Sequence, residues 1–442
     1  MSRLSRILDA IPRPDAGDLF QMQDWHRRLA TLVGALLIGL MALVFTYAGD
    51  SAQHLFEQLV ERYRWAPLVL TPALFVAIVM VTRKLAPETR GSGIPQVIAA
   101  AREPDAKGTA PLVSLKAGLA KIALTVAAMF GGASVGREGP TVQLGAAIMV
   151  QIHRLFGVRL TSGVYIAGGA AGVAAAFNTP LAGISFAIEE LAVAYEQRIA
   201  VLVMGAVMIS GLTAQGLAGN YVYFGHVGGH LPITTVLIVA PVAGILGGVL
   251  GGLFARLMLA LRGPGGKWRG ALERKPLLVA FICGLVVAVL GIASNGASWG
   301  TGYEPTKALL EGGAIDPLFG PAKFVAALAT AVSGMPGGIF APSLAVGAGF
   351  GSLLTWPFDA DQAGAIVLLG MAGYFVGVVR APLTAVIILS EATGSTGAIL
   401  PLFATALIGD WASTMVCRKR LYHALAEDFA APPESRPSGD VK

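Results

Sequence analysis

The sequence predicts an all-α polytopic membrane protein built from two repeated halves of broken helices. Of its 442 residues, 55% are hydrophobic and only 13% are charged, whereas a soluble domain carries roughly 25% charged residues. Long stretches such as Ile199 to Ala255 contain no Asp, Glu, Lys or Arg. Several segments of the first half also recur in the second half, which indicates an internal repeat.

The first expected element is a spanning helix that begins near residue 30. The apolar run there follows an amphipathic, Arg-containing segment, which is typical of a retained span rather than of a cleaved signal peptide. Because about 20 apolar residues cross the hydrocarbon core, the charge-free stretches leave room for roughly ten or more crossings or partial crossings.

Basic residues in the short connections and the tails account for the net charge of +6. Arg27 and Arg28 precede the first span, and Arg418, Lys419 and Arg420 follow the last one. Such residues mark the cytoplasmic side of a membrane, so we expect both termini in the cytoplasm. The same distribution argues against nucleic-acid binding.

Three segments of the first half align, in the same order, with three segments of the second half. The pairs are GREGPTVQLG (136–145) with GIFAPSLAVG (338–347), TPLAGISFAIEE (179–190) with APLTAVIILSEA (381–392), and GSGIPQ (91–96) with GTGYEP (300–305). The first two pairs are offset by 202 residues and the third by 209. Broken helices at corresponding places in two halves indicate a transporter with a binding site near the bilayer midplane.

This repeat divides the chain into five parts. They are a cytoplasmic N-terminal segment (1–29), a first half (30–217), a connection (218–230), a second half (231–415), and a cytoplasmic C-terminal helix and tail (416–442). Cys283 and Cys417 lie in separate apolar contexts without a CxxC motif, so we expect packing residues and no metal site.

The motifs GSGIP, GREGP and GGIFAP each place small residues just before a helix. We expect helices over Ile94 to Ala101, from Pro140, and from near Pro342, because proline suits the first turn of a helix. The N-terminus of each helix then faces the break. Free N–H groups and the helix dipole attract anions there, so ends that converge would bind a small anion.

Donor groups for such an anion are present in two of the motifs. Ser92 in GSGIP offers a hydroxyl, and Ile339 and Phe340 in GGIFAP offer backbone N–H groups. Carboxylate clusters suited to sodium or calcium are not evident in the sequence. We therefore predict an anion as the ligand.

Glu138 places a carboxylate at one of these helix starts, where an anion is favoured. When ionised, its side chain competes with the anion for the site, and when protonated it leaves the site, so it would act as a gate that binds protons. The alternative is an ordinary helix-start acid that pairs with the neighbouring Arg137, which itself either supports the anion potential or pairs only locally.

In this order and spacing, the three motifs resemble the signature motifs of the CLC family of chloride channels and chloride/proton antiporters, over about Ala30 to Glu427. The resemblance implies the CLC fold, in which two inverted repeats of broken and tilted transmembrane helices form each subunit. It also implies an anion site with Glu138 as its external gate. The implied anion-binding residues are Ser92, Gly93, Ile94, Ile339, Phe340 and Tyr422.

Exchangers of this family usually carry a second, inward-facing glutamate, and Glu190 falls on that position. Its alternative is a solvated helix end at the cytoplasmic interface, and this alternative is favoured for Glu189. Many relatives have acids just after GSGIP, where this chain has Gln96, Val97 and Ile98. The partner of the intramembrane Lys121 is therefore open, and a structural role is as well supported as tuning of the anion path.

The leading hypothesis is a chloride/proton antiporter that uses no cofactor and binds chloride. The resemblance implies a homodimer in lipid with one pore in each subunit. The short tail after Tyr422 fits a prokaryotic form, hence a bacterial inner membrane. A passive voltage- or pH-dependent chloride channel of the same fold is the alternative. An enzyme is disfavoured because Ser92 has no His or Lys in a suggestive motif.

Overall fold

The computed structural model describes residues 16–430 except 105, 192–196, 220, 221, 226 and 228–230. Parts of the predicted terminal segments and of the 218–230 connection thus lie outside the described residues. In the described part the chain is helical, and its only β-type pairings are isolated bridges.

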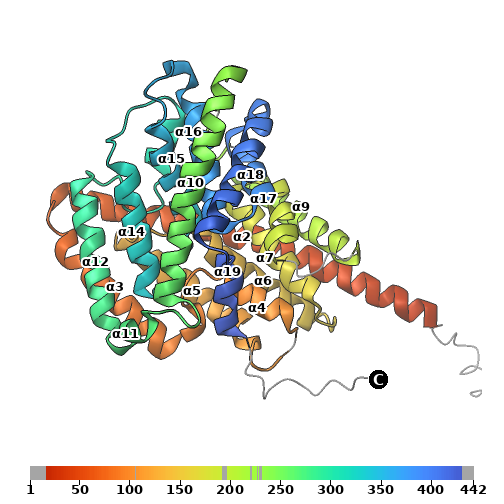
Figure 1. Ribbon diagram of the computed structural model, residues 1–442. Coiled ribbons are helices and arrows are strands. Elements are labelled where there is room, and N and C mark those ends of the chain that lie inside the picture. The colour runs from red at the N-terminus through yellow and green to blue at the C-terminus, as the bar shows by residue number, and fades with distance from the viewer. Residues whose placement is uncertain are drawn as a thin grey trace, which may run out of the picture.

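The helices of the first half surround the first two motifs. They are α2 (Ala16–Arg62), α3 (Pro67–Leu85), α4 (Ile94–Arg102), α5 (Leu115–Phe130), α6 (Glu138–Leu155), α7 (Ser162–Phe177), α8 (Pro180–Phe186) and α9 (Gln197–Ala218). Short helical turns lie at η1 (Pro87–Thr89), η2 (Ala110–Val113) and η3 (Ala187–Leu191), of which η3 is a π-helical turn. In Figure 1, α2 projects beyond the other helices at its N-terminal end.

The second half follows with helices of similar type. They are α10 (Ile233–Arg262), α11 (Arg269–Arg274), α12 (Pro276–Ala293), α13 (Tyr303–Leu310), α14 (Phe319–Ser333), α15 (Phe340–Ser352), α16 (Ala363–Val379), α17 (Pro382–Thr393), α18 (Ile399–Val416) and α19 (Leu421–Ala426). The turns η4 (Ala360–Gln362), η5 (Thr396–Ala398) and η6 (Glu427–Phe429) complete it.

Seven helical stretches in the described residues are long and apolar enough to cross a membrane, judged by length and composition. They lie in α2, α3, α9, α10, α12, α16 with the turn before it, and α18. Large apolar side chains on several of them are exposed, for example Val69, Leu237 and Met415. Such faces suit hydrocarbon rather than water as their surroundings, in agreement with a multi-pass membrane protein.

The interior is organised around α16, which is apolar on all sides and buried along its length. A helix of this kind belongs in the core of a large protein. It packs against α10, α15 and α18, which lie beside it in Figure 1. Glycine allows close contact between α10 and α16, because a Cβ atom on Gly251 would lie 2.5 Å from the Tyr374 carbonyl oxygen.

The two halves exchange caps at their corresponding helices. Glu189, at the end of the first half's repeat segment, accepts the N–H groups of Leu383 and Thr384 at the start of α17, at 3.0 and 2.7 Å. Glu391 accepts those of the second and third residues of α8, at 3.1 and 2.8 Å. These two glutamates are 202 residues apart and so occupy corresponding positions in the repeat. Each half thus provides a glutamate that caps a helix of the other half.

One predicted helix start was wrong by two residues, and another was predicted only approximately. The helix α4 begins at Ile94 as predicted, but α6 begins at Glu138 and α15 at Phe340, each two residues before its proline. Proline is tolerated there because none of the first N–H groups of a helix has an intrahelical partner. In addition, α2 runs through residue 30 without a break.

Candidate functional site

Main-chain hydrogen bonds join the three motif loops directly. Gly136 and Gly338 each donate an N–H to the other's carbonyl, both at 2.8 Å. Gly337 donates to the Gly91 carbonyl at 3.1 Å. The loops that precede α4, α6 and α15 therefore meet at one place inside the molecule, and this meeting involves both halves.

Glycine lets the first two loops approach each other. Gly93 has φ of +107°, and a Cβ atom there would lie 2.6 Å from the Gly139 carbonyl oxygen. A Cβ atom on Gly139 would in turn lie 2.8 Å from the Ser92 hydroxyl. Ser92 is buried, and its hydroxyl accepts the Ile94 N–H at 3.4 Å. The hydroxyl thus lies where α4 and α6 begin.

Glu138 reaches from one half of the molecule to the other. It is the first residue of α6 and is fully buried. Its Oε2 accepts the Ala341 N–H at the start of α15, at 3.4 Å, while its Oε1 has no hydrogen-bond partner among the described residues. An ionised carboxylate here lies at the N-terminus of a helix, where negative charge is stabilised.

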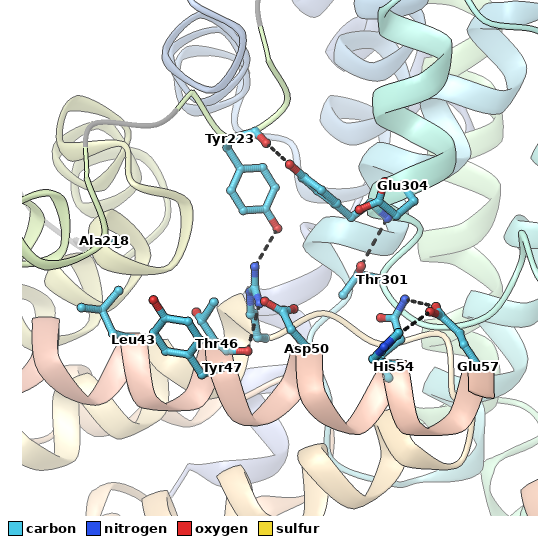
Figure 2. Close-up of a pocket in the computed structure, with 13 residues that line it drawn as sticks. Leu43, Thr46, Tyr47, Asp50, His54, Glu57, Ala218, Tyr223, Thr301 and Glu304 are labelled. Atoms are coloured by element: carbon cyan, nitrogen blue, oxygen red, sulfur yellow. Dashed lines mark hydrogen bonds and ion pairs between the residues drawn. The ribbon is translucent and has the colours of Figure 1, made fainter. Parts of the chain in front are cut away.

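Arg137 pairs with α2 and not with the neighbouring glutamate. Its Nη1 donates to Asp50 Oδ1 at 2.8 Å, and its Nη2 donates to the Tyr223 hydroxyl at 3.4 Å. Glu138 and Arg137 therefore interact electrostatically but share no hydrogen bond among the described residues. Arg137 also lines a cavity of about 460 Å³, which Figure 2 shows between α2 and the segments that carry Tyr223 and Thr301.

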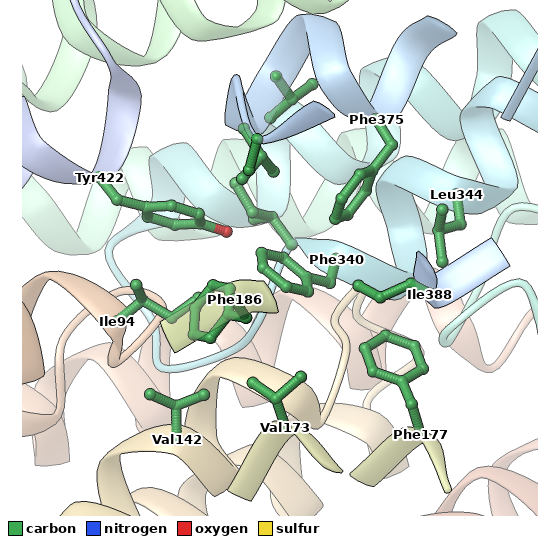
Figure 3. Close-up of a cluster of buried hydrophobic side chains, with 14 of the residues drawn as sticks. Ile94, Val142, Val173, Phe177, Phe186, Phe340, Leu344, Phe375, Ile388 and Tyr422 are labelled. Carbon is green, nitrogen blue, oxygen red and sulfur yellow. The ribbon is translucent and has the colours of Figure 1, made fainter. Parts of the chain in front are cut away.

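Tyr422 is the second residue of α19, as predicted for the start of the last short helix. Its ring lies 5.9 Å from that of Phe340, and both side chains are fully buried. The hydroxyl points toward Phe340 in Figure 3. The Tyr422 hydroxyl interacts with the Ser92 side chain. The geometry does not meet the criteria for a hydrogen bond with any described residue.

These contacts bring most of the predicted anion-binding residues together. Ile94 and Phe340 begin two of the helices, and Ser92 and Tyr422 supply hydroxyls. Ile339 is also buried and precedes Phe340 in the third loop. The arrangement presents N–H and O–H donors. Among the described residues, no three His, Cys, Asp or Glu side chains are grouped for a metal ion.

Glu190 lies in the π-helical turn η3 and is fully buried. Neither of its carboxylate oxygens has a hydrogen-bond partner in the described part of the chain. The alternative of a solvated helix end is therefore wrong for Glu190. Glu189 is half-buried and binds the start of α17.

Lys121 holds the loop that carries Ser92. Its buried Nζ donates to the carbonyls of Thr89 and Gly91, at 2.8 and 2.6 Å. Gln96, Val97 and Ile98 stand where many relatives have acidic residues, and the partners of Lys121 are main-chain carbonyls instead. These contacts agree with a structural role for Lys121, one of the two roles considered for it from the sequence.

Three notable residues were not identified from the sequence. Lys323 donates to the carbonyls of the 298–300 loop and lies 202 residues after Lys121, so the repeat offset could have revealed it. Asp50 and His423 contact Arg137 and Glu190 across 87 and 233 residues. No local pattern marks such distant pairs.

Comparison with known proteins agrees with this architecture. The family profile described as "Voltage gated chloride channel" matches residues 73–414. The structure of a slow cyanobacterial Cl⁻/H⁺ antiporter is 22% identical and aligns over 92% of this chain and 99% of its own, with a TM-score of 0.80.

Two further solved structures share the fold. A eukaryotic CLC transporter is 23% identical over 90% of this chain and 74% of its own, with a TM-score of 0.71. A CLC-type fluoride/proton antiporter is 22% identical over 93% of this chain and 99% of its own, with a TM-score of 0.74. Since the family profile also covers most of the sequence, the chain belongs to the CLC family of ion transporters and is not an enzyme.

Proposed function

We propose that the protein exchanges chloride for protons across a membrane, with Glu138 as the gate that competes with chloride. The supporting observation is the position of the Glu138 carboxylate. It crosses from α6 to the N-terminus of α15 and accepts the Ala341 N–H, in the region that Ser92 and Tyr422 also face. A carboxylate and a chloride ion cannot both occupy these donors.

Protonation explains how such a gate opens. A neutral Glu138 no longer gains from the helix N-terminus, so its side chain is free to leave the donors for chloride. Ionisation favours its return. In one cycle the side chain carries a proton out of the site, and chloride then binds the donors that the side chain has left. This alternation couples the movement of the two ions.

Glu190 is proposed to hand protons to the cytoplasmic side. Its carboxylate lies in η3, and Tyr422 interacts electrostatically with both Glu138 and Glu190. The tyrosine is thus close enough to both acids to sense their charge. Because Glu190 is buried and neither of its carboxylate oxygens has a hydrogen-bond partner among the described residues, its surroundings favour the neutral form, which suits a group that takes up a proton.

Paired flux measurements in reconstituted vesicles test this function. A chloride gradient should drive proton movement in the opposite direction in the wild-type protein. Glu138→Gln should reduce this proton movement to the background leak, because an amide cannot bind and release a proton. Glu61→Gln, on an exposed part of α2, is the matched control and should behave as wild type. Proton movement that persists in Glu138→Gln contradicts the gate assignment.

Glu190→Gln gives a second result that a passive channel cannot mimic. We expect chloride flux to continue while proton movement stops, because the chloride donors remain and the inner proton acceptor is lost. A wild-type current that reverses at the chloride equilibrium potential whatever the pH gradient would instead establish a channel.

The remaining proposals concern the assembly. We propose a homodimer in the bacterial inner membrane, with both termini in the cytoplasm and a complete pore in each subunit. Each subunit's anion donors come from one chain in the structure, which supports separate pores. A dimer in which inactivation of one subunit halves the chloride flux is the expected result, and complete loss of flux would contradict it.

A further inference from the structure

The imidazole of His423 lies between Glu190 and the protein surface. Its Nε2 is 3.7 Å from Glu190 Oε1, which is near the carboxylate but beyond hydrogen-bond distance, and the ring also interacts with the Glu190 main-chain carbonyl. On the other side, Arg102 Nη2 lies 2.9 Å from His423 Nδ1. The side chain of His423 is 24% exposed, whereas that of Glu190 is fully buried.

Arg102 fixes which ring nitrogen carries the proton. A guanidinium only donates hydrogen bonds, so Nδ1 must accept from it and carries no hydrogen. Burial, together with the guanidinium groups of Arg102 and Arg420, lowers the pKa of His423 to about 4. The neutral ring therefore carries its hydrogen on Nε2, the nitrogen that faces the oxygens of Glu190.

We propose that His423 is a positioning residue for Glu190, held by Arg102 so that its Nε2–H is always directed at the Glu190 carboxylate. The proposal rests on the function proposed above and adds a residue to its inner proton step. A donor aimed at a carboxylate favours its charged form. His423 thus helps Glu190 to release its proton toward the cytoplasm.

The same geometry argues against His423 as a proton carrier. A proton that leaves Glu190 would have to bind Nε2, which already carries a hydrogen. Transfer would require the ring to move its other hydrogen to Nδ1, where Arg102 opposes it. The other charged groups near Glu190 in the described residues are Arg420, on the segment before α19, and Glu189. Both remain when His423 is replaced.

Two substitutions separate the donor from the rest of the side chain. His423→Asn keeps an oxygen that can accept from Arg102 but is too short to direct a donor at Glu190. His423→Gln keeps an N–H donor near the position of Nε2. If His423 acts through its donor, only the asparagine variant should change the titration of Glu190.

Infrared spectroscopy measures that titration without any transport assay. The carboxyl band that disappears in Glu190→Gln identifies Glu190 in the purified protein. Its midpoint should move about one pH unit higher in His423→Asn, because a donor that faces the charged carboxylate is lost, and should stay near the wild-type value in His423→Gln. An unchanged midpoint in His423→Asn, or an equal shift in both variants, overturns the proposal.

The transport assay is a separate readout. In His423→Asn the dependence of coupled proton flux on cytoplasmic pH should move in the same direction, while uncoupled chloride flux in the Glu138→Gln background stays unchanged. If the wild-type protein moves no protons, the proposed function fails, whereas the infrared midpoints still decide the role of His423.

A substitution at the exposed Arg102 tests the same proposal if the His423→Asn protein does not fold. Arg102→Met releases Nδ1, so the imidazole is free to turn and directs its donor at Glu190 only part of the time. The Glu190 midpoint should then move upward by less than the shift expected for His423→Asn. A midpoint equal to wild type in Arg102→Met contradicts the fixed orientation.

Discussion

Lys121 and Lys323 show how single buried cations organise this protein. Each is fully buried, and each donates to main-chain carbonyls of the loop that precedes a broken helix. Carbonyl oxygens satisfy the ammonium groups without a carboxylate partner, which avoids a second buried charge. Of the two loops, only the one held by Lys121 carries Ser92.

Replacing these lysines should separate stability from chloride binding. Lys121→Met and Lys323→Met each leave buried carbonyls unpaired, at a cost of about 1–3 kcal/mol for each carbonyl. Both variants should therefore unfold at lower temperature. Chloride affinity, measured by calorimetry, should fall only in Lys121→Met, because the Ser92 loop is released. Equal loss of affinity in both variants would show that neither contact is specific to the anion site.

His423 also predicts a pH dependence of stability. Its pKa is lowered to about 4 in the folded protein. Between pH 4 and the ordinary pKa of histidine, the unfolded chain therefore binds a proton at His423 more readily than the folded protein does. Stability from this group is present at high pH and falls as the pH drops through that range, by up to about 3 kcal/mol.

The comparison with His423→Gln isolates this contribution. The thermal midpoint of the wild-type protein should fall more steeply between pH 6.5 and pH 4 than that of the variant. Parallel profiles would mean that the imidazole is not kept neutral by its surroundings. The wild-type profile alone is not sufficient, because carboxylates titrate in the same range.

At the level of elements, the reciprocal caps connect the two halves through helix starts. Glu189 binds the start of α17 and Glu391 binds the start of α8, each through a pair of N–H groups. A carboxylate at a helix N-terminus satisfies donors that the helix cannot satisfy itself and also favours the helix dipole. The caps therefore hold α8 and α17 against each other.

Removal of either cap should have a similar effect. Glu189→Ala and Glu391→Ala should each destabilise the protein by about 0.5–2 kcal/mol, the range measured for lost capping side chains. Thermal unfolding in detergent is the measurement, with the exposed Glu427→Ala as a control. A loss confined to one of the two variants would contradict the equivalence of the halves.

The sequence predicted the motif loops well because glycine and proline act locally. The start of α4 at Ile94 and the position of Tyr422 in α19 agree with the structure. The start of α6 was placed two residues too late, and that of α15 was predicted only as near Pro342, since proline is allowed at several positions in a first turn. Glycine and proline in the sequence therefore predict that a helix is broken more reliably than they predict the residue at which the next helix begins.

Contacts between distant segments could not be predicted in the same way. The pairing of Arg137 with Asp50 and of Glu190 with His423 depends on how separate helices meet. The repeat was the only long-range signal, and it located the corresponding helices of the two halves. It did not indicate that Glu189 and Glu391 exchange caps, because an offset carries no information about contact.

On the scale of the whole molecule, Asp428 connects the C-terminal turn to both halves. Arg269 in α11 donates to its two carboxylate oxygens at 2.7 and 2.8 Å, and Arg90, just before the Ser92 loop, lies 3.9 Å from it. These hydrogen bonds raise the pKa of Arg269. The contacts hold η6, and hence α19 with Tyr422, close to the rest of the protein.

Loss of this connection should loosen the C-terminal helix before the rest of the fold. In Asp428→Asn, backbone amides of α19 should exchange hydrogen faster, because the charge-assisted bonds from Arg269 are weakened. Asp359→Asn, on the loop before α16, is the control. Unchanged exchange in α19 would show that its packing against α4 is sufficient.

The bonds between Gly136 and Gly338 have a further consequence. They are made by peptide groups, which gain and lose no protons across the biological range, so the contact between the starts of α6 and α15 is the same in acid and in base. The Glu138 carboxylate, which would respond to acidity under the proposed function, is therefore held by a frame that does not respond. Substitution of that side chain leaves the main-chain frame in place.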